Sequence, residues 1–267
     1  MKTFQSQLDT LNAAGDTLFN AAIHGDWLQG RSSFGGLSTA LAYAAARKTL
    51  PIDQQDRPLR SILVTFAGPI PEGDVTINTR AVRTGKSVSV VQAEMTSELG
   101  AGLILSAVFG AGRETKSIAP TPKFAPEPVD STPDTPFVKG LMPGFLAGFR
   151  LRWTGGGVPS SAQDATRLGM WVRHGETNAQ SAAEELIAIG DVPPPIMMSH
   201  YNRPINASSL TWCLEFLEQP GSVETDWYYL DFDLEAARDG YSQQAGRIFA
   251  QDGTLMALSH QCMTFFE

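Results

Sequence analysis

The chain has 267 residues, with 20 Lys and Arg against 28 Asp and Glu, which gives a formal net charge of −8. This acidic balance argues against a general nucleic-acid-binding protein, because phosphate binding depends on clustered Lys and Arg. Hydrophobic residues make up 42% of the chain, enough for a sizeable core, which excludes a disordered chain.

Cysteine usage and apolar runs narrow the class further. Only Cys213 and Cys262 occur, both in apolar, strand-like runs where a free cysteine packs as a small hydrophobic residue. A disulfide framework and a multi-cysteine metal site are therefore excluded. Residues 1–15 lack the apolar core of a secretion signal, and no uncharged apolar run approaches the roughly 20 residues of a membrane span. We expect a cytoplasmic protein with no membrane partner.

The first half reads as one helix followed by an antiparallel meander. Residues 37–48 are rich in Ala and Leu, contain no Pro or Gly and stop before Pro51, which predicts a well-buried helix. Runs rich in Val, Ile, Thr and Phe then meet at turns that contain glycine, as strands do. The predicted strands are 61–71, 74–84, 86–97 and 102–110.

A proline-rich segment divides the chain. Six of the 17 prolines lie between Ala119 and Phe137. Proline fixes φ and offers no amide donor, so residues 119–137 are predicted to be an extended linker. The linker separates an N-terminal domain of residues 1–118 from a C-terminal domain of residues 138–267.

The second half repeats the order of the first. A helix is predicted over 179–189, and strands are predicted at 145–153, 167–174, 208–217, 227–234, 242–250 and 255–265. A local match supports a duplication, because the segments 83–87 and 238–242 share Arg-x-Gly-x-Ser at corresponding hairpin positions. Glycine is common in tight hairpins in any case. The match therefore supports a duplication only because the order of helices and strands around it is also repeated.

Familiar nucleotide, hydrolase and metal signatures are absent from the sequence. No phosphate-binding loop or dinucleotide fingerprint occurs. Gly30-Arg31-Ser32 begins like the turn of a serine hydrolase, but Phe34 stands where glycine is needed. The four histidines, which are His24, His174, His200 and His260, lack zinc-ligand spacing. We expect neither a metal site nor a cofactor.

Three polar residues of the second half form a candidate site. Asp191 follows the predicted helix, Ser209 begins a long strand, and Gln261 lies in the last strand. Spacing alone favours a simpler interpretation, in which they are a helix-end carboxylate, a strand-start hydroxyl and a buried amide.

Short motifs spread over nearly the whole chain change that balance. They are Phe34-Gly35-Gly36, Gly68-Pro69, Arg83-Thr84-Gly85-Lys86-Ser87, Trp171-Val172-Arg173, Ile189-Gly190-Asp191, Ser208-Ser209-Leu210, Gln251-Asp252-Gly253 and Gln261. In order and approximate spacing this set resembles the acyl-CoA thioesterase II type. The resemblance implies an α+β double hotdog fold, in which each of two tandem halves wraps a curved antiparallel sheet around one long helix.

The resemblance also implies an activity and a site. In this family an aspartate, a threonine or serine, and a glutamine orient the attacking water, and these roles fall on Asp191, Ser209 and Gln261. The substrate is then an acyl-CoA, which is hydrolysed to the free acid and CoA. Exposed amides after Gly35 and Gly36, or at the start of the predicted helix 179–189, are candidates for holding the oxyanion, and the sequence does not say which helix faces the site. Glycine at positions 35 and 36 also suits close helix packing.

Arg83 and Lys86 are candidates for binding the CoA phosphates, although exposed basic residues near turns are usually only solvated. The chain departs from the family where Thr211 and Trp212 replace a frequent Asp-His pair. That departure keeps open a non-catalytic acyl-CoA-binding protein. A hotdog dehydratase or hydratase is a further alternative, although no histidine has a recognisable partner. Exposed sheet edges also predict a homodimer.

Overall fold

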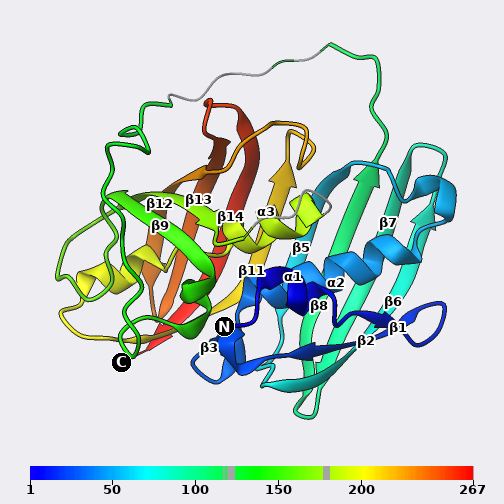
Figure 1. Ribbon diagram of the computed structural model, residues 1–267, viewed down its shortest axis with the longest axis horizontal. Coiled ribbons are helices and arrows are strands. Elements are labelled where there is room, and N and C mark those ends of the chain that lie inside the picture. Colours follow the sequence, from blue (N-terminus) through cyan, green and yellow to red (C-terminus); the bar gives the residue numbers. More distant parts are fainter. Residues whose placement is uncertain (117, 119–123, 177–180, 267) are drawn as a thin grey trace.

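The computed structural model describes residues 1–116, 118, 124–176 and 181–266. Its helices are α1 (Phe4–Leu8), α2 (Gly35–Thr49) and α3 (Ala182–Gly190). The first-half strands are β1 (Asn12–Ala13), β2 (Leu18–Ile23), β3 (Leu28–Gln29), β4 (Ser32–Ser33), β5 (Leu59–Phe66), β6 (Gly73–Thr84), β7 (Val88–Ser97) and β8 (Gly100–Gly110). The second-half strands are β9 (Phe149–Gly155), β10 (Arg167–His174), β11 (Asn206–Phe216), β12 (Tyr228–Arg238), β13 (Tyr241–Ala250) and β14 (Leu255–Phe266). Figure 1 shows these elements in the colours of the sequence.

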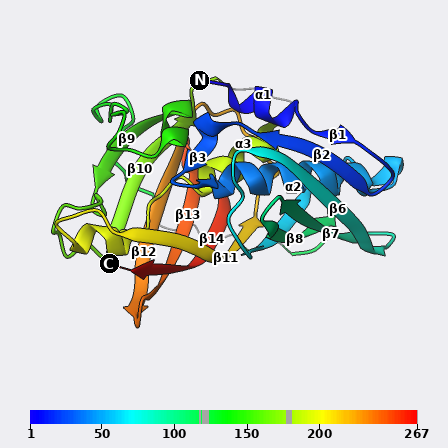
Figure 2. The ribbon, with the colours of Figure 1, turned by 90° about the horizontal axis from the view of Figure 1, so that it is seen from below.

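One large sheet joins both halves. Its strand order is β1-β2-β6-β7-β8-β5-β11-β14-β13-β12-β10-β9, and neighbouring strands run antiparallel throughout. The halves meet edge to edge where β5 pairs with β11, from Ser61 opposite Glu215 to Thr65 opposite Thr211. This junction satisfies two strand edges that would otherwise be open. The sheet curves around α2 and α3, as Figure 2 shows from below. The chain therefore has the α+β double hotdog fold that the resemblance implies.

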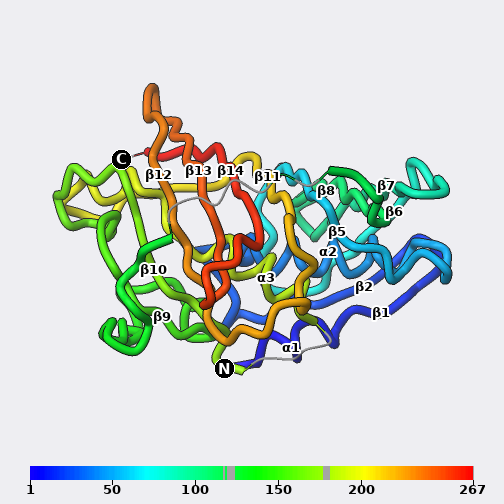
Figure 3. The backbone as a smooth tube through the Cα atoms, turned by 90° about the horizontal axis from the view of Figure 1, so that it is seen from above, coloured from blue at the N-terminus to red at the C-terminus, as the bar shows by residue number. Residues whose placement is uncertain are grey.

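The two central helices pack directly on each other. The α2 segment from Leu37 to Ala46 is almost wholly buried, and its many alanines let helix and sheet approach closely. The start of α2 meets the end of α3, because a Cβ atom built on Gly36 would lie 2.9 Å from the Cα atom of Ala188. The two helices lie side by side in the middle of the molecule (Figure 3).

Strand register reveals the duplication that the sequence suggests. The β5·β8 ladder has a bulge after Leu59, and the β11·β14 ladder has one after Ser209. Two pairs beyond the bulge, Ile62 lies opposite Ala107 in the first half. At the same step of the second half, Trp212 lies opposite Gln261. By this register, Ile62 corresponds to Trp212 and Ala107 corresponds to Gln261. Positions in one half can therefore be compared with those in the other.

The described part of the linker packs against the second half. Phe124 contacts the rings of Trp171, Tyr229 and Phe249 on β10, β12 and β13. Val129 is buried in the same cluster. The segment 124–136 has no helix or strand, as its prolines predict, yet it covers the outer sheet face here. Pro120 and Pro122 lie outside the described residues.

Several element boundaries differ from those predicted. The 61–71 strand ends at Phe66, and residues 144–148 form a 3-10 turn (η3) before β9. Pro69 and Pro143 flank these positions and cannot donate to a ladder. The second central helix ends at Gly190, and Ala179 lies outside the described residues. The sequence did not predict α1 or β2. Cys213 and Cys262 are half-buried rather than buried.

Candidate active site

Asp191 sits where the ends of the two central helices meet. It is the C-cap residue of α3, and its carboxyl group accepts a hydrogen bond from the backbone N–H of Gly36 in the first turn of α2. Its Oδ1 atom also accepts a hydrogen bond of 2.7 Å from Nε2 of Gln261 on β14. Two of the three predicted catalytic residues are therefore in direct contact.

Glycine at position 35 leaves the space that this carboxylate occupies. A Cβ atom at Gly35 would lie 2.7 Å from Oδ2 of Asp191 and 3.0 Å from Cε1 of Phe66. Neither distance is compatible with a side chain unless its neighbours move. Glycine at this position thus allows the start of α2 to lie against the carboxylate.

Ser209 lies on the strand next to Gln261. Its Cα partner is Met263, which is two residues from Gln261 and therefore on the same face of β14. On the other side of β11, Thr211 pairs with Thr65, so Ser209 lies beside the end of β5 that carries Phe66. Among the described residues, no hydrogen bond joins the Ser209 hydroxyl to another side chain. The sheet places the three residues in one region, but only Asp191 and Gln261 are bonded to each other.

The Asp191 carboxyl group has an unusual acidity. Burial raises its pKa to about 7, and the hydrogen bonds from Gln261 and Gly36 lower it by less. The residue as a whole keeps part of its surface accessible. A carboxylate with a pKa near neutrality accepts protons more readily than an ordinary aspartate, which suits a general base.

A second glutamine, Gln244, extends the polar group away from Asp191. Its Nε2 atom donates to Oε1 of Gln261 at 3.4 Å, and its Oε1 atom accepts from the backbone N–H of Ile196 at 3.2 Å. Gln244 is fully buried. The sequence analysis did not single it out. The available signal was strand alternation, because residue 244 has the inward parity of Ser242 and Ile248 on β13.

Thr211 and Trp212, which replace the Asp-His pair frequent in the family, point to opposite faces of the sheet. Thr211 is exposed, whereas Trp212 is buried directly opposite Gln261. The indole N–H of Trp212 donates to Oγ of Ser259 at 2.9 Å. The ring packs near Gly190, where an added Cβ atom would lie 3.1 Å from it. Trp212 therefore fills the core beside the site, and its donor is used elsewhere.

Arg83 and Lys86 lie away from Asp191. Both are exposed on the β6–β7 hairpin, which Arg57 holds through bonds to the carbonyls of Gly85 and Lys86. Ser89, at the start of β7, donates to Gln54 just beyond the end of α2. The hairpin thus lies at the C-terminal end of α2, and Gly35 begins the other end. A 15-residue helix is about 22 Å long.

No histidine bonds to the Asp191–Gln261 pair in the part of the chain that the structure describes. His260 follows the alternation of β14 to the outer face and contacts Glu235 at 3.0 Å. His200 bonds the carbonyl oxygen of Ala165. An Asp/His proton relay, which a hotdog dehydratase needs, has no support here. The described residues also contain no group of three or more His, Cys, Asp or Glu side chains suited to a metal ion.

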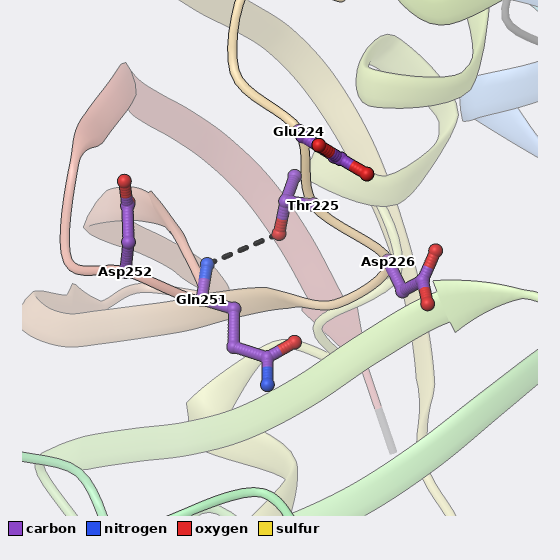
Figure 4. Close-up of a pocket in the computed structure, with 5 residues that line it drawn as sticks. All are labelled: Glu224, Thr225, Asp226, Gln251 and Asp252. Carbon is purple, nitrogen blue, oxygen red and sulfur yellow. Dashed lines mark hydrogen bonds between the residues drawn. The ribbon is translucent and has the colours of Figure 1, made fainter.

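A surface hollow elsewhere holds another motif from the sequence. It lies between the loop at Glu224, Thr225 and Asp226 and the turn at Gln251 and Asp252. Figure 4 shows the backbone N–H of Gln251 donating to Oγ1 of Thr225, at 3.1 Å. With three carboxylates on its lining, this hollow repels anions such as CoA phosphates. Its motif shapes a turn and contributes nothing to the Asp191 site.

Family models decide the relationship. The acyl-CoA thioesterase C-terminal domain matches residues 124–265, and the acyl-CoA thioesterase N-terminal domain matches residues 23–110. The chain belongs to the acyl-CoA thioesterase family. It is a thioester hydrolase, and it resembles the thioesterase II proteins of that family. No curated protein matches the sequence.

Solved structures share the fold at low identity. A hotdog protein of unknown function from Alicyclobacillus acidocaldarius has a TM-score of 0.85 and 20% identity, over 100% of this chain and 99% of the other. The TesB protein of Mycobacterium avium subspecies paratuberculosis has a TM-score of 0.78 and 17% identity, over 99% and 98%. Acyl-CoA thioesterase II TesB2 of Mycobacterium marinum has a TM-score of 0.75 and 16% identity, over 99% and 98%. Among the described residues, no helix has the length and apolar character needed to cross a membrane.

Proposed function

We propose that this thioesterase hydrolyses an acyl-CoA to the free acid and CoA by direct attack of water, with Asp191 as the general base. The observation that carries the proposal is the 2.7 Å hydrogen bond between Gln261 and Asp191 at the N-terminus of α2. Ser209 and Gln261 hold the water by hydrogen bonds. A hydroxyl and an amide both donate and accept, which fixes a water in one orientation.

The reaction needs no covalent nucleophile. The water oxygen bonds to the thioester carbonyl carbon while one water proton passes to Asp191 and the carbonyl electron pair moves to oxygen. The tetrahedral intermediate collapses, the C–S bond breaks, and the departing thiolate takes the proton from Asp191. The acid then loses its own proton to solvent. Positioning and proton transfer are the contributions required of the protein.

The start of α2 is suited to stabilise the oxyanion. The amides of Leu37 and Ser38 already donate to the carbonyl of Phe34. The N–H of Gly36 donates to Asp191, so the amide of Gly35, at the positive end of the helix dipole, is the first-turn donor that we propose for the oxyanion. Donors fixed before the reaction stabilise a developing negative charge at little reorganisation cost.

Thiol release tests the proposal. A panel of short, medium, long and aromatic acyl-CoAs is offered to wild type, Asp191→Ala and Ser209→Ala proteins of verified fold. We expect turnover by wild type on at least one chain length, a loss of about 100-fold or more in Asp191→Ala, and a smaller loss in Ser209→Ala. Tight acyl-CoA binding by wild type with no turnover would instead support a non-catalytic binding protein.

The proposal further includes CoA as the carrier, the cytoplasm as the location and a homodimer as the assembly. Parallel assays with acyl-CoA and acyl carrier protein thioesters decide the carrier. The expected cytoplasmic location and homodimer are checked by cell fractionation and by light scattering of the purified protein.

A further inference from the structure

Gln244 and Gln261 lie opposite each other on β13 and β14, and both side chains point into the core. The bonds around them form a continuous series. The backbone N–H of Ile196 donates to Gln244, the amide nitrogen of Gln244 donates to Gln261, and the amide nitrogen of Gln261 donates to Asp191. One backbone amide thus begins a series that ends at the carboxylate.

The direction of this series decides which end of Gln261 faces Asp191. A side-chain amide presents a donor at one end and an acceptor at the other, and its two orientations differ little in shape. The N–H of Ile196 is fixed by the backbone, so it selects the oxygen of Gln244 and turns the Gln244 nitrogen toward Gln261. Gln261 must then offer its oxygen to Gln244 and its nitrogen to Asp191. The opposite orientation would set the Gln261 oxygen against the carboxylate.

The fold itself does not require polar residues at these positions. Gln261 corresponds to Ala107 in the first half, by the bulge and pairing register given above, and the strand partner of Ala107 is Val91. Both Ala107 and Val91 are fully buried in the core. An apolar pair therefore occupies the equivalent positions of the same architecture. Burying two amides costs free energy unless they are bonded, so the polar pair at the Asp191 end calls for a reason beyond packing.

We infer that Gln244 is a positioning residue, which locks the Gln261 amide in the orientation that donates to Asp191. Its catalytic consequence rests on the proposed function, whereas its effect on Gln261 does not. Gln244 itself is not bonded to Asp191, so it acts on the reaction only through Gln261.

A double-mutant cycle tests this dependence. We expect Gln244→Leu to lower kcat/KM about 10-fold, the equivalent of one lost buried hydrogen bond. In a Gln261→Ala background the same substitution is expected to change kcat/KM by less than about twofold, because the residue through which it acts is absent. Equal effects in both backgrounds would overturn the inference. Gln243→Leu is the matched control, since Gln243 is the preceding residue and has outward parity.

A second readout does not depend on turnover. The carboxyl carbon of Asp191 is followed by NMR against pH in wild type and Gln244→Leu, with Asp191→Asn to assign its signal. Without Gln244 the Gln261 amide is free to reverse, so that its oxygen accepts a hydrogen bond from the neutral acid instead of its nitrogen donating to the carboxylate. We therefore expect the pKa of Asp191 to rise. Among the described residues, burial and two uncharged groups, Gln261 and the Gly36 amide, set this pKa.

The two experiments separate the possible failures. An unchanged Asp191 titration in a protein that hydrolyses acyl-CoA would refute the positioning role and leave the proposed function intact. If the Asp191 titration shifts in Gln244→Leu but wild type hydrolyses no thioester, the positioning role stands and the proposed function is refuted. Should Gln244→Leu fail to fold, Gln244→Met takes its place, because methionine is unbranched like glutamine and has no amide donor. Its effect on kcat/KM must likewise vanish in the Gln261→Ala background.

Discussion

Oδ1 of Asp191 and Nε2 of Gln261 are 2.7 Å apart, so the residue that ends α3 and a residue within β14 form one hydrogen-bonded unit. Burial and this bond act on the carboxyl group in opposite directions. The pKa of Asp191 therefore depends on whether the packing of α3 against β14 preserves the hydrogen bond from Gln261. The pH dependence of the reaction reports this pKa.

The first prediction concerns that pH dependence. Because the pKa of Asp191 is about 7, kcat/KM should rise with pH through about 7 and then level off. The hydrogen bond from Gln261 lowers this pKa, so Gln261→Ala should move the rise to higher pH as well as reduce the plateau. Stopped assays in a buffer series of constant ionic strength measure both. A rise centred near pH 4 in wild type would show that Asp191 is not the base.

Gly35→Ala should damage the site more than the fold. The new Cβ atom would lie 2.7 Å from Oδ2 of Asp191, so the carboxylate must move. We expect kcat to fall about 10-fold or more, because small displacements of a catalytic group are costly. Gly112→Ala is the control, since nothing lies within 4 Å of its added Cβ atom. Equal activity in the two variants would mean that the Gly35 contact is irrelevant to catalysis.

Asp191→Asn should be more stable than wild type at alkaline pH. The folded state raises the pKa of Asp191 from 3.8 to about 7, so between these values the folded protein binds more protons than the unfolded chain. The free energy of unfolding of wild type therefore falls as pH rises through this window, and the loss is complete above about pH 7. Asparagine cannot ionise, so the variant should gain on the order of 1–4 kcal/mol at pH 8 relative to pH 4. Urea unfolding of both proteins at pH 4 and pH 8 measures this gain. The prediction is contradicted if the difference in stability between Asp191→Asn and wild type is the same at both pH values.

Much of this architecture can be predicted from the sequence, because the buried strands and the alanine-rich helix have strong periodic patterns. The α1 helix escaped prediction because five residues are too few to show a helical period. Motif order pointed to Asp191 and Gln261. Gln244 could not be found in this way, because its role depends on the register between β13 and β14, which no local pattern encodes.

Arg83 and Lys86 provide a test of how CoA is held. If they contact its phosphates, Arg83→Ala and Lys86→Ala should each raise KM for an acyl-CoA up to about fivefold, the range of an exposed ion pair. KM for the same acyl group on pantetheine, which lacks the nucleotide, should not change. Arg80→Ala, an exposed arginine of the same strand, is the control. Equal effects on both substrates would place the hairpin outside the phosphate site.

His174 should govern the acid side of the stability profile. Its ring lies between Phe4 and Phe149, with centroids 4.7 and 4.6 Å away. Nε2 contacts the carbonyl oxygen of Glu185 at 3.1 Å and so carries the proton, while the buried Nδ1 has no hydrogen-bond partner among the described residues. Burial lowers the pKa of His174 to about 4. A second proton would place an unpaired charge among aromatic rings.

The unfolded chain therefore binds more protons than the folded protein between pH 6.5 and about 4, and stability is lost as pH falls through this window. His174→Gln keeps a donor for the Glu185 carbonyl but does not titrate. Its stability relative to wild type should improve by on the order of 1–3 kcal/mol between pH 7 and pH 4, even though lost ring packing makes it less stable at pH 7. Urea unfolding across that range measures the change. A profile in His174→Gln that runs parallel to the wild-type profile would show that His174 is not its source.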